Sequence, residues 1–251
     1  MDLSERPDHV GARHPWEKSR FRFFRDVLEH AHWSSSALRV LDAGAGDAWF
    51  STQLLESMPD ITRITCWDAE YSDALIADLR ATTPDRIEFR RERPDTQFDL
   101  VLLLDVLEHV PDDRSFLKTI VETNLATDGF VLISVPAWQI LFSSHDTRLR
   151  HYRRYSPEEC RRVIDDTGLQ IVRQGGLFHS LLAPRTAQVV KEKLLGANHD
   201  GSPPKLDWNA GALVTRIIDT ALHADNYVSH RLADIGINVP GMSYWALCKR
   251  T

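Results

Sequence analysis

Cysteine pairs and long apolar runs are both missing from this sequence. The three cysteines, Cys66, Cys160 and Cys248, are widely spaced and odd in number, which argues against a disulfide framework and against a CxxC metal site. The longest apolar stretches, at 101–104 and 131–135, are far too short to cross a bilayer. The opening residues, MDLSERPDHV, are charged and lack the apolar segment of a secretory signal. We therefore expect a reduced, cytoplasmic protein.

An excess of basic residues is missing as well. The net charge is −6 and the isoelectric point is near 6.0, which disfavours a nucleic-acid partner such as RNA. Of the 30 basic residues, 24 are arginines, and several of these lie close together. Guanidinium groups suit carboxylates and phosphates, although a solvated, salt-bridged surface is the alternative for each of them. The clustered arginines are Arg148, Arg150, Arg153, Arg154, Arg161 and Arg162.

The pattern of apolar residues predicts an α/β fold. The composition, 43% hydrophobic and 26% charged, is normal for a globular protein with a sizeable core. Short leucine-rich and β-branched runs alternate with amphipathic stretches, which indicates βα units around a mostly parallel sheet. A capping box of Ser156 and Glu159 marks one helix start. Strands are expected at 39–43, 63–67, 87–90, 99–104, 130–135, 169–174 and 243–249, and helices at about 16–33, 48–57, 72–81, 112–124 and 157–167.

Residues 177–240 depart from this alternation. They predict two amphipathic helices, at about 180–195 and 211–233, separated by a loop rich in glycine and proline. A segment of this size would make only a marginal core by itself, so we expect an insertion that forms a lid or a docking surface. The expected layout is one domain over 1–251, divided into a helical cap (1–35), a core (36–176), the insertion (177–240) and a last strand (241–251).

A glycine turn follows the first expected strand, in VLDAGAGDAWFS at 40–51. Gly44 and Gly46 allow the backbone to approach a ligand closely, and the helix that follows presents free N–H groups. Asp42, just before the turn, could reach the amino group of a ligand or organise the turn itself. The dinucleotide fingerprint requires glycine or alanine at position 49, where this chain has Trp49. A nicotinamide oxidoreductase is therefore only a minor alternative.

Two aspartates follow neighbouring expected strands. Asp68 ends ITRITCWD, and a carboxylate at that position can accept both ribose hydroxyl protons of a nucleoside. The alternative for Asp68 is that it lies in an exposed turn or caps a helix. Asp105 ends the buried run FDLVLLLD. Because ligands of open α/β sheets bind beyond the carboxyl ends of the strands, we expect Gly44, Asp68 and Asp105 to converge.

Together these motifs resemble those of the class I S-adenosylmethionine (SAM)-dependent methyltransferases. The resemblance rests on VLDAGAGDAWF, CWDAEYS and FDLVLLLDVLEHVPDD, and it extends over about 35–175. It implies a Rossmann-like, seven-stranded, mostly parallel sheet with helices on both faces and an antiparallel last strand, supplied by MSYWALCK. A pattern of VPAW, HD and HYRRYS also resembles a bacterial subgroup of small-molecule methyltransferases of unassigned substrate.

The resemblance also implies which residues hold SAM, and thereby S-adenosylhomocysteine (SAH) as product. Gly44 and Gly46 would pass along its methionine part, Asp68 with the adjoining Ala69 would hold the ribose, and Asp105 and Val106 would line the site. The chain departs from the family pattern at two places. Ala48 replaces a frequent third glycine, and RRERPD replaces an aspartate that often contacts adenine, so that Arg91 or Glu92 could fill that space.

Residues that follow the fifth expected strand are the candidates for acceptor chemistry. His145 is the first candidate for a general base because imidazole titrates near neutral pH, and Asp146 or His151 could orient it. Hydrogen bonding that pins the loop is the alternative for these residues. A metal bound by His145, Asp146 and His151 lacks an established ligand spacing, so no metal is expected. His109 is expected to be structural.

The same loop offers residues for binding the acceptor. Arg153 and Arg154 could bind an anionic acceptor or pair with local carboxylates such as Glu158 and Glu159. Tyr155 is a further candidate, although a buried structural role is favoured for it.

Two amphipathic segments could cover the site or contact other surfaces. Trp16, in a helix before the sheet, could shield the methyl-transfer site from water. The stretch at 180–195 has the pattern of a helix on a membrane surface, but packing against the protein is favoured.

The sequence thus predicts a SAM-dependent methyltransferase that acts on a small or secondary metabolite, with oxygen as the favoured acceptor atom. The alternatives are an NAD(P)-dependent oxidoreductase of Rossmann type and a non-catalytic SAM-binding protein.

Overall fold

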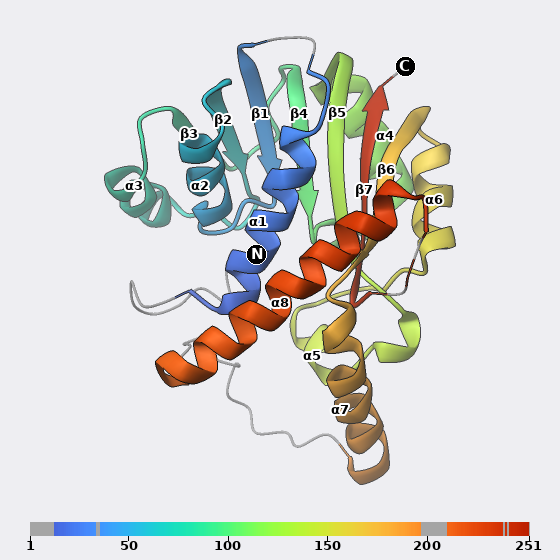
Figure 1. The fold of residues 1–251 in the computed structure, drawn as a ribbon. Coiled ribbons are helices and arrows are strands. Elements are labelled where there is room, and N and C mark those ends of the chain that lie inside the picture. The colour runs from blue at the N-terminus through green and yellow to red at the C-terminus, as the bar shows by residue number, and fades with distance from the viewer. Residues whose placement is uncertain (1–12, 34–35, 197–209, 238, 240, 251) are drawn as a thin grey trace.

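A seven-stranded sheet organises the protein (Figure 1). The computed structural model describes residues 13–33, 36–196, 210–237, 239 and 241–250. The strand order is β3-β2-β1-β4-β5-β7-β6, and β7 runs antiparallel to both of its neighbours, which confirms the predicted fold class. The strands are β1 (Leu38–Ala43), β2 (Ile61–Trp67), β3 (Ile87–Arg90), β4 (Phe98–Leu104), β5 (Leu125–Pro136), β6 (Leu169–Leu177) and β7 (Ser243–Arg250).

The helices follow the predicted positions closely. The expected helix at 16–33 ends four residues early, at Glu29, and the five-residue helix α5 was not predicted. Capping boxes at His14–Glu17 and Ser156–Glu159 begin α1 and α6. The helices are α1 (Pro15–Glu29), α2 (Trp49–Ser57), α3 (Asp73–Thr82), α4 (Asp113–Asn124), α5 (Ser144–Arg148), α6 (Pro157–Asp165), α7 (Leu182–Leu195) and α8 (Gly211–Asp234).

The apolar core lies on both faces of the sheet. Successive residues of β4 alternate between the two faces, so that Leu102 packs into one cluster and Leu103 into the other. Phe23 of α1, Leu54 of α2 and Leu222 of α8 belong to the first cluster. The second cluster includes residues of α4 and α6. Because both faces are covered, the central strands read in the sequence as continuous apolar runs.

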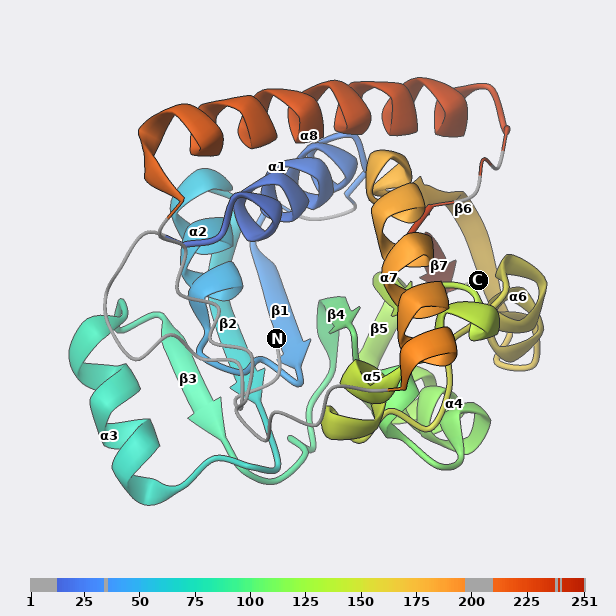
Figure 2. The same ribbon diagram turned by 90° about the horizontal axis from the view of Figure 1, so that it is seen from below.

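The segment between β6 and β7 packs on the rest of the protein through both of its described helices. Figure 2 shows α8 lying along α1. The Asn226 side chain donates a 2.8 Å hydrogen bond to the Ser19 carbonyl, and the His230 ring stacks on Phe23 with 4.2 Å between centroids. Helix α7 buries Val189 but leaves Leu194 and Leu195 exposed. Among the described residues, no helix is both long and apolar enough to cross a membrane.

Candidate functional site

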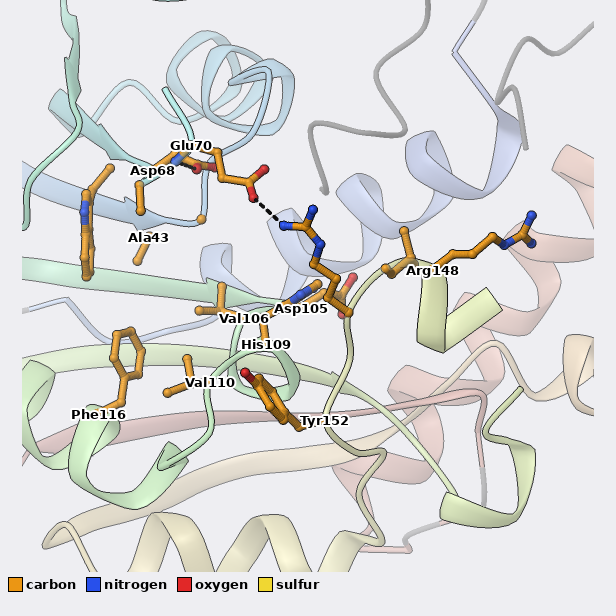
Figure 3. Close-up of a pocket in the computed structure, with 15 residues that line it drawn as sticks. Ala43, Asp68, Glu70, Asp105, Val106, His109, Val110, Phe116, Arg148 and Tyr152 are labelled. Carbon is orange, nitrogen blue, oxygen red and sulfur yellow. Dashed lines mark hydrogen bonds and ion pairs between the residues drawn. The ribbon is translucent and has the colours of Figure 1, made fainter. Parts of the chain in front are cut away.

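A large cavity opens at the carboxyl ends of β1, β2 and β4 (Figure 3). Its volume is about 510 Å³, which is within the range of small-molecule sites. The residues that line it come from these strand ends, from the turn that follows β4, from α4, and from the end of α5 and the loop that follows it. They are Ala43, Gly44, Trp67, Asp68, Ala69, Glu70, Asp105, Val106, His109, Val110, Phe116, Arg148, Leu149, Arg150 and Tyr152.

The glycine turn is held against β2. The Gly44 amide donates a 2.7 Å hydrogen bond to the Trp67 carbonyl, with Gly44 at a φ of +68°. A Cβ atom on Gly44 would lie 2.9 Å from Cγ2 of Val106, so a side chain at this position would collide with the opposite wall. Glycine is therefore required here by both backbone conformation and space.

Asp68 connects the turn to the end of β2. One carboxylate oxygen accepts a 3.0 Å hydrogen bond from the Gly46 amide, and the other accepts a 2.9 Å bond from the Glu70 amide. A carboxylate has about four lone-pair sites, so these two bonds leave acceptor capacity on both oxygens. Asp68 lines the cavity and is half-buried. Gly46 is not among the described residues that line it, and its amide instead orients Asp68.

Asp105 adopts a left-handed backbone conformation at the end of β4. Its φ is +58°, a conformation that is strained for a residue other than glycine. An ion pair of 2.6 Å joins its carboxylate to Nη1 of Arg20, which lies on α1. This pair fixes the N-terminal helix above the strand end, because the Arg20 side chain is nearly buried. Strain of this kind clusters at functional sites.

A smaller pocket lies beneath α1 and adjoins the large cavity at Gly44, which lines both. Its volume is about 40 Å³, and its lining includes Trp16, Arg20 and Asp42. Nη2 of Arg20 is buried and has no hydrogen-bond partner among the described residues. An unpaired buried guanidinium nitrogen is costly, so this pocket suits a ligand with a carboxylate.

Asp42 organises the start of α2. Its carboxylate accepts a 2.6 Å hydrogen bond from the hydroxyl of Ser51, and burial raises the pKa of Asp42 to about 6. Asp42 was expected either to reach the amino group of a ligand or to organise the turn. Its hydrogen bond with Ser51 is a contact of the second kind.

An aromatic wall closes one end of the cavity. The rings of Trp67 and Phe116 stack at 6.1 Å between centroids, and the Trp67 indole nitrogen donates to the Arg91 carbonyl. The Arg91 side chain pairs with Asp73 at 2.6 Å, and neither Arg91 nor Glu92 lines the cavity among the described residues. The space that the sequence assigned to these two polar residues is therefore bordered by aromatic rings.

The wall opposite the strand ends comes from the loop after α5. The Tyr152 amide donates a 2.8 Å hydrogen bond to the Glu108 carbonyl, which holds this loop against the turn after β4. Across the cavity mouth, Nη1 of Arg150 lies 3.8 Å from the Glu70 carboxylate (Figure 3). Arg150 thus brings a guanidinium group of the arginine cluster to the cavity mouth, where an anionic group could bind, whereas the Arg148 side chain points away from Asp68 and Glu70 (Figure 3).

The candidate catalytic residues lie behind that wall. Neither His145 nor Asp146 is among the described residues that line the cavity. Asp146 is fully buried and accepts hydrogen bonds from Nδ1 of His151 at 3.0 Å and from Nε of Arg154 at 2.7 Å. Burial alone would raise the pKa of Asp146, but these hydrogen bonds hold it below its ordinary value. Burial also lowers the pKa of His145 to about 4, assisted by the Arg185 charge, which leaves the imidazole neutral at pH 7.

The candidate acceptor-binding residues are occupied by contacts within the protein. Arg153 pairs with Asp113 at 2.9 Å, Arg154 pairs with Asp146, and the Tyr155 hydroxyl donates a 2.7 Å hydrogen bond to Asp113. Arg154 and Tyr155 are buried, so they cannot reach an acceptor in the cavity. The predicted partners Glu158 and Glu159 are not used: Glu159 instead caps α6 through Ser156. None of Arg153, Arg154 and Tyr155 is among the described residues that line the cavity.

Several cavity residues were not proposed from the sequence as ligand contacts. Trp67, Phe116 and Val110 carry no polar motif, and Tyr152 stands in a run of polar residues whose orientation depends on the tertiary fold. The arginine cluster was a usable signal for Arg148 and Arg150. Nothing in the local sequence distinguishes these two from Arg153 and Arg154, which turn away into the protein.

Curated proteins similar to this chain in sequence include methyltransferases. A probable SAM-dependent methyltransferase of Mycolicibacterium smegmatis is 28% identical over 168 residues, which are 63% of this chain and 62% of that protein. A ubiquinone biosynthesis O-methyltransferase of Idiomarina loihiensis is 25% identical over 182 residues, covering 64% of this chain and 72% of that protein. The chain thus matches less than two thirds of the mycobacterial relative's length.

The fold agrees with these relatives. The solved structure of a putative sarcosine dimethylglycine methyltransferase from Galdieria sulphuraria has a TM-score of 0.58 at 16% identity, covering 99% of this chain and 93% of that one. A family model described as a methyltransferase domain matches residues 16–174, more than half of the chain. The chain therefore belongs to the methyltransferase domain family and has the fold of the class I enzymes that use SAM as cofactor.

Proposed function

We propose that this protein transfers a methyl group from SAM to an oxygen atom of a small or secondary metabolite. The observation that carries the proposal is the pairing of a glycine turn with Asp68, whose carboxylate is fixed by two backbone amides at the rim of the cavity. Family membership speaks against the NAD(P)-dependent oxidoreductase. The names of the ubiquinone biosynthesis O-methyltransferases favour oxygen as the acceptor atom.

The residues present fit SAM at both of its ends. The orphaned guanidinium nitrogen of Arg20 would pair with the methionine carboxylate in the small pocket, which meets the cavity at Gly44. Asp68 would accept the ribose hydroxyls beside Ala69, and Trp67 and Phe116 offer apolar faces to the adenine. When bound, SAM supplies a methyl group on a positively charged sulfur, which an acceptor oxygen can displace.

The chain's own contribution is to orient the cofactor and exclude water. Trp16 lies edge-on to Phe178 at 6.3 Å between centroids and borders the small pocket, where it would shield the methionine part. Val106 and the strained Asp105 line the cavity and would lie between the cofactor and the acceptor. Holding both reactants in one geometry supplies much of the rate enhancement of a displacement reaction.

The acceptor would enter between the strand ends and the loop that carries Arg148, Arg150 and Tyr152. An anionic group on the acceptor could displace Glu70 from Arg150, since that ion pair is largely exposed and therefore weak. The insertion at 177–240 would act by positioning this loop. Glu192 of α7 accepts a 2.8 Å hydrogen bond from the Ser144 amide, at the start of α5.

Calorimetric titration with SAH tests the cofactor site. Wild-type protein should bind SAH, and Asp68→Asn should bind it at least tenfold more weakly, because an amide offers fewer acceptor sites to the ribose. Asp85→Asn, which changes an exposed aspartate, is the matched control and should bind as the wild type does. Absence of SAH binding at millimolar concentration by a folded wild type would overturn the proposal.

Turnover separates an enzyme from a non-catalytic SAM-binding protein. Incubation with SAM and a cell extract should yield products heavier by one methylene, with release of SAH. Binding of SAH without any methylated product would favour the non-catalytic alternative, and binding of NAD(P)H in place of SAH would favour the oxidoreductase.

A further inference from the structure

A cluster of three potential metal ligands lies beside the acceptor side of the cavity. Glu108 and His109 lie in the 3₁₀ turn Leu107–His109 after β4, and His151 lies in the loop after α5. One carboxylate oxygen and one ring nitrogen from each histidine all lie within 4.8 Å of one another. The two imidazole rings are perpendicular, with 4.6 Å between their centroids.

Glu108 is the first independent indication of a ligand. Its side chain is fully buried, and neither carboxylate oxygen has a hydrogen-bond partner among the described residues. Burial of a carboxylate without partners is unfavourable, because the group loses its hydration and gains no hydrogen bond in return. Buried charges are ordinarily paired or bound to metals, so the two oxygens of Glu108 are available to bind a cation.

The orientation of His151 is the second indication. Its Nδ1 lies 3.0 Å from the Asp146 carboxylate, which Arg154 and Arg185 hold in place. In a neutral imidazole that donates from Nδ1, the lone pair is on Nε2, on the other side of the ring. Histidines that bind metals usually donate their other ring N–H to a carboxylate in this manner.

We propose that Glu108, His109 and His151 form a binding site for a divalent first-row transition metal ion such as Zn²⁺ or Mn²⁺. Two imidazoles and one carboxylate are a donor set for such ions, whereas Mg²⁺ and Ca²⁺ prefer oxygen ligands alone. Metal–ligand bonds of about 2.0–2.2 Å require the donor atoms to move inward by about 1 Å. The hydrogen bond from the Tyr152 amide to the Glu108 carbonyl holds the two segments at this separation.

An ion bound at this site would activate the methyl acceptor. This role of the ion rests on the proposed function. Because His109 lines the cavity, an ion held by these three residues would be accessible from the space between the strand ends and the loop after α5. A hydroxyl oxygen of the acceptor that occupied such a position would be more acidic, as metal-bound water is. The ion would also orient that oxygen, which explains how the cavity could activate an acceptor although His145 does not line it.

Metal titration of untagged, chelator-treated protein tests the site without any turnover. In competition with a chromophoric zinc indicator, the wild type should bind one equivalent of Zn²⁺ with a micromolar or lower Kd. Glu108→Gln and His151→Ala should each weaken binding at least tenfold. The matched controls Glu56→Gln and His223→Ala change exposed side chains elsewhere and should leave the Kd unchanged.

Further measurements keep the proposal open to contradiction if a buried variant fails to fold. His109→Ala changes a partly exposed ring, and Co²⁺ added to the wild type should give visible d–d bands that this variant lacks. Absence of a stoichiometric Zn²⁺ site in folded wild type, or unchanged binding in folded Glu108→Gln, His109→Ala and His151→Ala, would overturn the inference. SAH binding without Zn²⁺ binding would refute this site alone, and Zn²⁺ binding without SAH binding would refute the proposed function alone.

Discussion

At the scale of single residues, Asp146 shows how a side chain with a catalytic pattern can instead support a site. Its carboxylate lies at the centre of three basic groups, from His151, Arg154 and Arg185, in the layer behind the cavity wall. The sequence shows that His151 and Arg154 lie near Asp146 along the chain, whereas Arg185 is 39 positions away. It does not show which way each side chain points in a loop, because loops lack the periodicity that reveals faces in helices and strands.

Asp146→Ala should lower the free energy of unfolding by about 3–5 kcal/mol, because it leaves two nearly buried guanidinium groups without their anionic partner. Urea denaturation of this variant beside the exposed control Asp85→Asn measures the difference. A loss below about 1 kcal/mol would show that the network contributes little to stability.

Asp42 predicts a dependence of stability on pH. Because burial raises its folded-state pKa to about 6, from an ordinary value of 3.8, the folded protein binds this proton more tightly than the unfolded chain does. Protonated Asp42 therefore contributes to the free energy of unfolding below pH 4, and this contribution is lost as the pH rises through 6. Asp42→Asn keeps an oxygen acceptor for Ser51 and removes the titration.

The stability of Asp42→Asn relative to the wild type should therefore increase by about 2 kcal/mol between pH 4.5 and pH 7.5, since one pKa unit corresponds to about 1.4 kcal/mol. Urea denaturation of both proteins at the two pH values measures this change. An equal difference at both pH values would contradict the raised pKa.

Among the elements of the fold, most helices and strands could be predicted from the sequence, but the cavity wall formed by the loop after α5 could not. Continuous apolar runs located β4 and β5, and the capping box located α6, because these signals are local. Helix α5 was missed because its few residues have no apolar periodicity, although Ser143 and Asp146 form a capping box. The placement of Tyr152 against Glu108 depends on a contact between distant segments, which no local pattern encodes.

Helix α8 fixes the start of α7 through one side chain. The carboxylate of Asp225 accepts hydrogen bonds from the amides of His179 and Ser180, at 3.1 and 2.9 Å. Asp225→Ala should lower the free energy of unfolding by about 2 kcal/mol, because both N–H groups lose the Asp225 carboxylate as a hydrogen-bond acceptor. It should also accelerate amide hydrogen exchange over 179–195. Asp219→Ala removes an exposed ion pair of the same helix and should change neither quantity appreciably; equal effects of both variants would refute the role of Asp225.

In the whole molecule, the cofactor side of the cavity could be predicted from the sequence, whereas the acceptor side proposed above could not. The family match covers 16–174, which includes the glycine turn, Asp68 and the loop after α5, while α7, α8 and β7 lie outside it. Asp68 and Gly44 could be identified from spacing because parallel strands bring their carboxyl ends to one edge. The residues that contact the acceptor could not, since they depend on how the insertion and the loop pack together.

We expect the cavity at this edge to hold SAM, with Asp68 at the ribose and the small pocket beneath α1 at the methionine end. A crystal structure of the protein with SAH tests it most directly. We expect both ribose hydroxyls within hydrogen-bond distance of the Asp68 carboxylate and the homocysteine carboxylate beside Arg20. Density for SAH elsewhere on the protein, or an Asp68 side chain that makes no contact with the ribose, would contradict this placement of SAM.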